Sequence, residues 1–405
     1  MRSRRAVWVV AHRWIGLTTA LFLVIVGLTG SLLAYYEELD RALAPELLTV
    51  PLRDAPVLDP FTLRDRAAAL EPRGNVDVVD LDPQAGRTYQ ALITPRDDPE
   101  TGEPFQLAYD VLFIDPYTGG RLGERHWGAL SFERKALMPF VYKLHYALAM
   151  PDRLVMFGIY LLGAVAFAWT LDCFIALYLT MPLSPRGASP RRRWFQRFRP
   201  AWSPKWRAGA FRLIYDLHRA FGLWTWAMLF VLAWSSVALN LTEVYEPVTR
   251  AMLGPLTPRH AEPPSSGPIL DWRDAYARGR ELMADTARAN GFTVLRESEM
   301  YLDPDHRAYH YVVHGTADTS ANGYTLVMFD AATGALERVE WAGSETTADI
   351  VTNWLISLHT ARVFGAPMHA FVCAMGLVIA ILSASGVYVW WVKRRRRARM
   401  RGVVA

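Results

Sequence analysis

Two histidine–arginine pairs lie inside apolar runs of this sequence, where such side chains are costly to place. His12-Arg13 follows Ala11 and precedes Trp14-Ile15-Gly16-Leu17, and the same arrangement returns at His218-Arg219, with an offset of 206 residues (218 − 12). Ionisable residues inside membrane segments are rare and usually functional. Both imidazoles are therefore candidates for metal ligation or proton transfer.

Four apolar runs must position these residues. Each is long enough to cross a bilayer, which takes about 20 helical residues. They cover 6–36, 153–181, 212–245 and 363–392, and a short outer-face helix is expected before the last run, within 351–392.

Arginine-rich stretches border the runs at the N-terminus, in the 182–211 link and in the 393–405 tail. Short basic loops stay cytoplasmic. We therefore predict a multi-pass protein of the bacterial inner membrane with both termini in the cytoplasm and two large periplasmic loops, 37–152 and 246–350. Every basic stretch adjoins a membrane segment, so topology explains it and no nucleic-acid partner is expected.

The histidines form two sets of matched depth. His12 and His218 lie about 10 Å inside the cytoplasmic face at 1.5 Å per residue, and His145 and His359 lie at the outer face, before the second and fourth runs. Two imidazoles at equal depth on different helices are what a bis-histidine haem requires. We hypothesise one haem iron held by each set; interfacial snorkelling and a proton relay are the alternatives.

Four further residues are candidates for supporting roles. His369 lies ten residues beyond His359, has no counterpart in the first half, and could replace His359, touch a haem propionate or bind substrate. Arg13 and Arg219 could pair with propionates or reach lipid headgroups. Asp172, the acidic residue deep in a run, could pair with one of these arginines or orient a histidine.

The chain also contains an internal repeat. Leu144-His145 is echoed by Leu358-His359 at an offset of 214 residues (359 − 145), and the Asp-x-x-Thr-Gly turn at Asp115 returns at Asp330. Each half is therefore helix, outside domain, helix, in parallel orientation. The outside domains are expected to be α+β, with helices at 63–70 and 271–290 followed by β-rich segments.

These features together resemble the PepSY-associated transmembrane proteins, and within that family the inner-membrane ferric-siderophore reductases. The resemblance rests on His12-Arg13, His218-Arg219, the two Leu-His pairs and the two Asp-x-x-Thr-Gly turns. It implies a membrane α-helical protein with four transmembrane helices, two b-type haems and two periplasmic α+β PepSY-like domains.

The function expected on this basis is an oxidoreductase that passes electrons across the membrane to a periplasmic Fe(III)–siderophore and releases Fe(II) for iron uptake. The sequence shows no GxGxxG after a strand and no P-loop. Electrons are thus expected from a cytoplasmic reductase or from membrane quinol. The alternatives are a di-haem carrier for another periplasmic acceptor, a haem-free PepSY module that binds or regulates a protease, and a transporter.

Overall fold

The computed structural model describes residues 2–182, 191–257, 266–318, 323–341, 343 and 345–402. The chain divides into two compact units, each assembled from segments far apart in sequence. The helical unit comprises Met1–Tyr35, Val141–Met252 and Val351–Ala405. The mixed unit comprises Tyr36–Phe140 and Leu253–Ile350.

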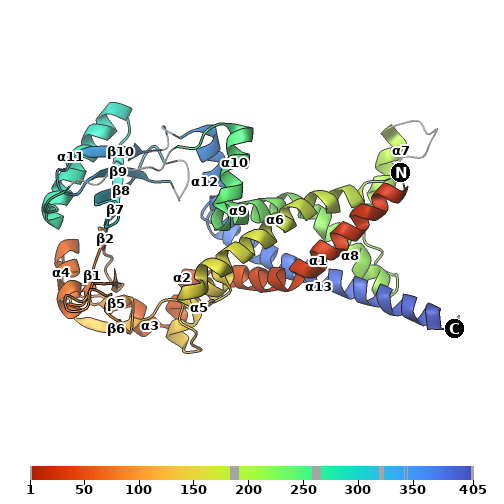
Figure 1. Cartoon of the computed structure of the whole chain (residues 1–405), viewed down its shortest axis with the longest axis horizontal. Helices are drawn as coiled ribbons and strands as arrows, with labels where there is room; N and C mark the ends of the chain where they lie inside the picture. The colour runs from red at the N-terminus through yellow and green to blue at the C-terminus, as the bar shows by residue number, and fades with distance from the viewer. Residues whose placement is uncertain are drawn as a thin grey trace. The chain divides into compact units, whose positions relative to one another are not determined.

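Long apolar helices build the helical unit (Figure 1). Within the described residues three spans are long and apolar enough to cross a membrane, at Arg4–Leu33, Arg134–Thr180 and Ala366–Arg399, and a bent helix pair provides a fourth if it counts as one span. The main helices are α1 (Arg2–Leu33), α6 (Val155–Thr180), α8 (Ala210–Trp224), α9 (Trp226–Asn240) and α13 (Ala366–Gly402). Shorter helices complete the unit: α5 (Arg134–Ala147), η1 (Asp152–Leu154), α7 (Arg191–Trp202), α10 (Thr242–Leu253) and α12 (Thr347–His359).

The predicted run 212–245 differs most from its expected form. Helices α8 and α9 meet at Thr225 with a bend of 69°. Thr225 has φ −101° and ψ 4°, outside the helical region, and its hydroxyl donates to the Phe221 carbonyl at 2.7 Å. A threonine hydroxyl that bonds a carbonyl of the preceding turn competes with the helix ladder and bends it.

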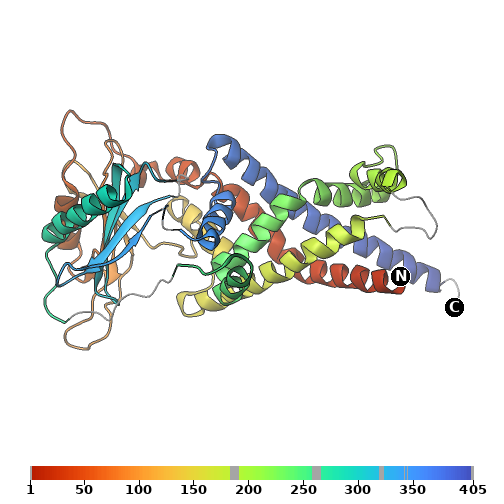
Figure 2. The same ribbon diagram turned by 90° about the horizontal axis from the view of Figure 1, so that it is seen from above.

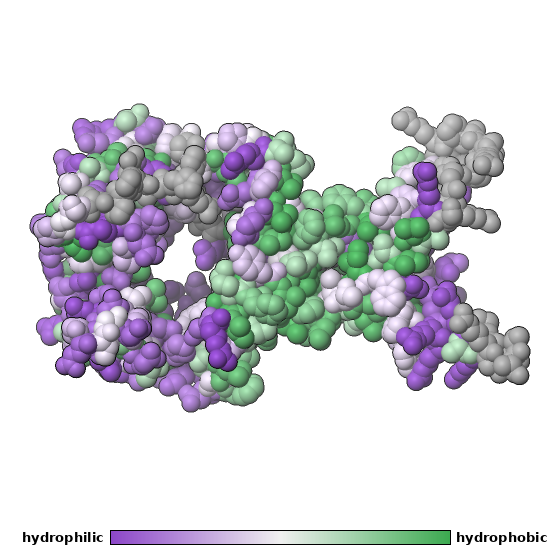
Figure 3. Space-filling model, in the orientation of Figure 1, coloured by the Kyte–Doolittle hydropathy of each residue, from purple (hydrophilic) through white to green (hydrophobic). Residues whose placement is uncertain are grey.

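The surface of the helical unit is largely apolar around its middle, coloured green in Figure 3, and hydrophilic at the end that carries both termini. Val7, Leu21, Phe157 and Ile381 are all more than half exposed. An exposed apolar surface of this extent indicates contact with another apolar phase. Together with the span lengths, this identifies a multi-pass membrane unit.

The two segments predicted as periplasmic loops contribute to one unit. Strand β2 (Val78–Asp80), from the first segment, pairs antiparallel with β7 (Val294–Asp303) of the second, with Val79 opposite Met300. This gives one five-stranded sheet in the order β10-β9-β8-β7-β2. Its remaining strands are β8 (Ala308–Gly315), β9 (Thr325–Asp330) and β10 (Leu336–Glu340).

A shared hydrophobic core explains why the segments join. Phe61 and Val79 from the first segment pack in one cluster with Met300, Tyr309 and Phe329 from the second. Helix α11 (Trp272–Asn290) lies along the same sheet (Figure 2). The predicted boundaries 37–152 and 246–350 therefore describe two chain segments of one unit, because each alone would leave part of this apolar surface exposed.

The Asp-x-x-Thr-Gly motifs form the turns of two hairpins. One turn joins β5 (Val111–Ile114) to β6 (Arg121–Arg125), and the other joins β9 to β10. The aspartates accept hydrogen bonds from backbone amides two or three residues on, and Gly119 and Gly334 have φ of +70° and +68°. Glycine suits this left-handed conformation. The other elements are α2 (Tyr36–Leu43), α3 (Pro45–Leu48), α4 (Pro60–Leu70), β1 (Gly74–Asn75), β3 (Tyr89–Leu92) and β4 (Thr94–Pro95).

Candidate cofactor site

Two pairs of histidines lie in the helical unit, and each pair takes one residue from either half of the chain. In the first histidine pair, the rings of His12 on α1 and His218 on α8 have centroids 6.3 Å apart. In the second histidine pair, His145 on α5 and His359 on α12 are 6.2 Å apart. Sequence reasoning matched these residues by depth, and the fold brings the same residues together, with the rings tilted in the first pair and edge-on in the second.

Every one of the four imidazoles is held at Nδ1 by a polar side chain of another helix. His12 contacts both carboxylate oxygens of Asp172 at 2.9 Å. The other three contact hydroxyls: His145 with Thr29 at 2.9 Å, His218 with Ser385 at 2.9 Å and His359 with Ser235 at 2.7 Å.

These partners decide which nitrogen carries the proton. A hydroxyl has one proton to donate, and in each of the three it goes to a carbonyl of its own helix: Thr29 to Ile25 at 2.8 Å, Ser235 to Val231 at 2.7 Å and Ser385 to Leu382 at 2.9 Å. The hydroxyl oxygens must then accept from Nδ1–H, as the Asp172 carboxylate does. When these rings are neutral, Nε2 therefore keeps its lone pair for a metal.

The arrangement follows the repeat. In each half, the histidine of the first long helix is held by the last long helix. The histidine of the short helix, α5 or α12, is held by the first long run. Thr29 and Ser235 are separated by 206 residues (235 − 29), the same offset as His12 and His218. Sequence reasoning missed these two hydroxyls and Ser385, although this offset could have identified the first two.

The ring separations fit two imidazoles on opposite sides of one metal ion. Metal–imidazole bonds are about 2 Å, and ring bonds of about 1.35 Å place each nitrogen roughly 1.1 Å from its ring centroid. Two such ligands have centroids about 6 Å apart, close to both observed values. Among the described residues no group of three or more histidine, cysteine, aspartate or glutamate side chains could hold a metal ion, and a bis-histidine haem needs only two protein ligands.

Glycines leave room beside the histidines. Gly16 and Gly222 each follow a first-pair histidine by four residues, on the same helix face. A Cβ built at either position meets no atom within 4 Å. Beside the second pair, a Cβ on Gly30 would lie 3.1 Å from Cε1 of His145. The absence of side chains at these two positions leaves open space beside the first pair, as a flat cofactor would require.

Two buried arginine nitrogens near the first pair also fit a haem. The Nε atoms of Arg13 and Arg219 are buried without a hydrogen-bond partner among the described residues. Arg219 otherwise bonds the buried carboxylate of Asp216 at 3.3 Å and the Pro200 carbonyl. Buried N–H groups normally have a partner, and a propionate would supply an acceptor here.

His369, His310 and His314 lie outside the two pairs. His369 packs edge-on against Tyr35, with ring centroids 5.9 Å apart. In strand β8, His314 contacts Asp318, whereas His310 stacks on Tyr301 at 4.4 Å. Burial lowers the pKa of His310 to about 4, so this ring is neutral at physiological pH.

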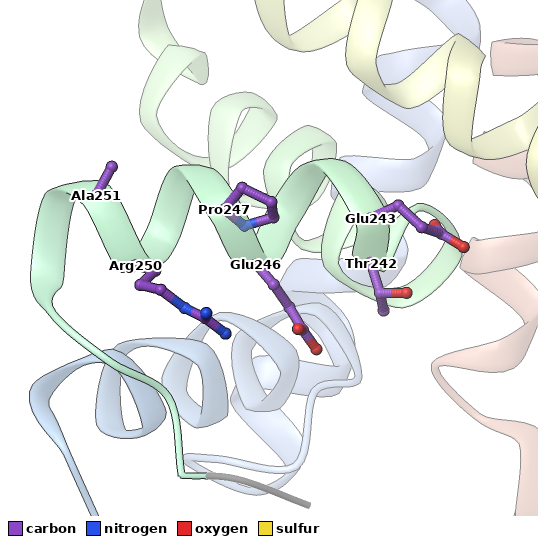
Figure 4. Close-up of a pocket in the computed structure, with 6 residues that line it drawn as sticks. All are labelled: Thr242, Glu243, Glu246, Pro247, Arg250 and Ala251. Atoms are coloured by element: carbon purple, nitrogen blue, oxygen red, sulfur yellow. The ribbon is translucent and has the colours of Figure 1, made fainter.

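A shallow groove runs along α10 and is lined by Thr242, Glu243, Glu246, Pro247, Arg250 and Ala251 (Figure 4). Its charged residues are the acidic Glu243 and Glu246 and the basic Arg250. Glu243 accepts a hydrogen bond from the Tyr160 hydroxyl at 2.8 Å. Acidic and basic side chains share the groove, so it has no single sign of charge.

The family model described as the PepSY-associated TM region matches residues 9–393, a range that includes all four paired histidines. No curated protein matches the chain.

Proposed function

Because the chain belongs to the PepSY-associated transmembrane family, we propose that it is an inner-membrane oxidoreductase that binds two b-type haems and reduces Fe(III)–siderophore on the periplasmic side. The observation that carries this proposal is the presence of two histidine pairs in which the Nδ1 atom of every ring is held by a polar side chain of another helix. When bound, haem supplies the one-electron carrier that these side chains lack.

The chain's own residues perform the binding and positioning. His12 and His218 would hold one iron, and His145 and His359 the other. The hydroxyl and carboxylate anchors fix each ring and keep Nε2 unprotonated. Arg13 and Arg219 would neutralise propionates. His369 remains a second candidate, close to the outer pair in sequence, for contact with a propionate or substrate.

The separation of the two sets suits transfer across a membrane. His12 and Thr29, the anchor of His145, are 17 residues apart on α1, which is about 26 Å of helix at 1.5 Å per residue. The hydrocarbon core is about 30 Å thick. The proposed topology has both termini in the cytoplasm, where a reductase or membrane quinol would deliver electrons to the first pair.

The ferric-siderophore acceptor comes from the sequence resemblance. Hard oxygen ligands hold Fe(III) far better than Fe(II), so addition of one electron would release the iron. The chain would need no nucleophile or general base for this step.

The first test is a reduced-minus-oxidised visible spectrum of the purified protein, with haem quantified per chain. We expect low-spin bis-histidine bands and one haem for each histidine pair. His12→Ala and His359→Ala should each remove one haem. Gly222→Leu should remove the haem of the first pair, because the leucine side chain would fill the open space beside it. Gly209→Ala also places a side chain in open space, but away from both pairs, and should retain both haems. Folded protein without haem would contradict the proposal.

A second experiment tests the acceptor. Reduced protein is mixed with an Fe(III)–hydroxamate complex and a ferrous chelator, and reoxidation of the haem bands is followed. The matched Ga(III) complex, which cannot be reduced, should leave the bands unchanged. If haem is present but the ferric complex does not reoxidise it, the protein serves another acceptor.

A further inference from the structure

One of the four side chains that anchor the paired histidines differs chemically from the other three. Three rings donate to neutral hydroxyls, on Thr29, Ser235 and Ser385, whereas His12 donates to the carboxylate of Asp172. Asp172 is the only acidic residue in α6, and its side chain is 12% exposed. Burial of a carboxylate at this depth costs free energy. A hydroxyl at the same position would have anchored the ring with a smaller penalty.

A carboxylate acts on a bound metal differently from a hydroxyl. It draws the Nδ1 proton more strongly and makes the imidazole a better electron donor at Nε2. It also adds a negative charge where the dielectric constant is low. Both effects stabilise ferric over ferrous iron and lower the reduction potential, which is set in part by hydrogen bonds to the axial ligands.

Neighbouring cations act in the opposite direction, but less directly. Arg219 is paired with the buried carboxylate of Asp216 at 3.3 Å. The guanidinium of Arg13 lies over the ring of Trp14, 5.6 Å from its centroid. No hydrogen bond joins either guanidinium to a paired imidazole among the described residues, and the charge of Lys393 acts on His218 without a hydrogen bond to it. Asp172, in contrast, is hydrogen-bonded to His12.

We infer that Asp172 makes the first histidine pair the lower-potential site, so that electron transfer from the first pair to the second is energetically downhill. This rests on the proposed haem binding at both pairs. Asp172 is thus a positioning residue that also sets the direction of transfer. Its charge gives the two repeated sites different reduction potentials.

The test is a spectroscopic redox titration of the full-length protein. His359→Ala, which leaves the first pair, assigns one of the two waves, and the wild type should show it at the lower potential. Asp172→Asn keeps an oxygen acceptor for Nδ1 but removes the charge. Asp172→Ser supplies a hydroxyl like the other three anchors. Both variants should raise the midpoint of the lower wave and leave the upper wave in place.

Thr29→Val is the matched control, because it removes a neutral acceptor from the second pair; it should shift only the upper wave. The inference is overturned if the first-pair wave is the higher one, or if neither Asp172 variant moves it. Absence of any haem wave would instead overturn the proposed function.

Discussion

At the scale of single residues, small hydroxyl side chains decide the chemistry of the paired histidines. Thr29, Ser235 and Ser385 give their protons to carbonyls of their own helices and accept from Nδ1 of the rings. The residue type alone does not signal this role, because most serines and threonines inside an apolar run bond only the preceding turn; only the shared offset of Thr29 and Ser235 marks two of the three. The distinction depends on which helix faces them.

A second residue-scale feature, His310, makes the stability of the mixed unit sensitive to pH. Its ring is buried, and neither nitrogen has a hydrogen-bond partner among the described residues. Burial lowers its pKa from 6.5 to about 4. As pH falls below 6.5, the unfolded chain gains a proton that the folded chain does not, so folding stability should decline until about pH 4, by about 3 kcal/mol at most.

His310→Phe keeps a ring against Tyr301 and removes the titrating group. We expect thermal unfolding of the mixed unit between pH 6.5 and 4 to depend less on pH in this variant. His306→Gln, at an exposed neighbouring histidine, is the control and should retain the wild-type dependence. An unchanged pH profile in His310→Phe would contradict this explanation.

At the scale of elements, the close approach of α1 and α13 holds the anchors in place. A Cβ on Gly27 would lie 2.6 Å from the Gly376 carbonyl oxygen, and one on Gly376 would lie 2.3 Å from that of Gly27. Ser31 reinforces the contact through its hydrogen bond to the Cys373 carbonyl at 2.8 Å. Small residues at a helix crossing let backbones approach in this way.

Gly376→Val should therefore separate the two helices. We expect a lower thermal-unfolding midpoint of the helical unit and weaker haem retention, since α13 also carries Ser385. Ala374→Val, two residues away on an exposed position of the same helix, is the matched control and should resemble the wild type. Equal stability of the two variants would show that the glycine contact contributes little.

At the scale of the whole molecule, the chain folds as two units that are each discontinuous in sequence. The pairing of β2 with β7 means that the five-stranded sheet is complete only when both segments, 37–152 and 246–350, are present. Ion pairs join the same segments, between Arg273 and Asp65 at 3.0 Å and between Arg296 and Asp82 at 3.2 Å.

Val79→Asp tests the independence of the units. Val79 is fully buried in the shared core, and an unpaired buried carboxylate costs several kcal/mol. We expect the unfolding transition of the mixed unit to fall in temperature, while the haem spectrum and the transition of the helical unit persist. Leu92→Asp, at an exposed strand position, is the control. Loss of haem in Val79→Asp would show that the units do not fold separately.

The sequence by itself determined the family, the membrane character and the four paired histidines. These are one-dimensional signals: the length of apolar runs, the location of arginines and the recurrence of residues at a fixed offset. The family prediction is confirmed by the match over residues 9–393; haem binding and siderophore reduction remain predictions.

Only the tertiary structure decided the bend at Thr225, the joining of the outside segments in one sheet, and the partner of each Nδ1. Asp172 illustrates the difference. Its depth was readable from the chain, and two partners were open to it, but the choice of His12 depends on how α1 and α6 are rotated against each other. Such contacts join residues 160 positions apart, and no local pattern specifies them, because they arise from packing across the whole unit.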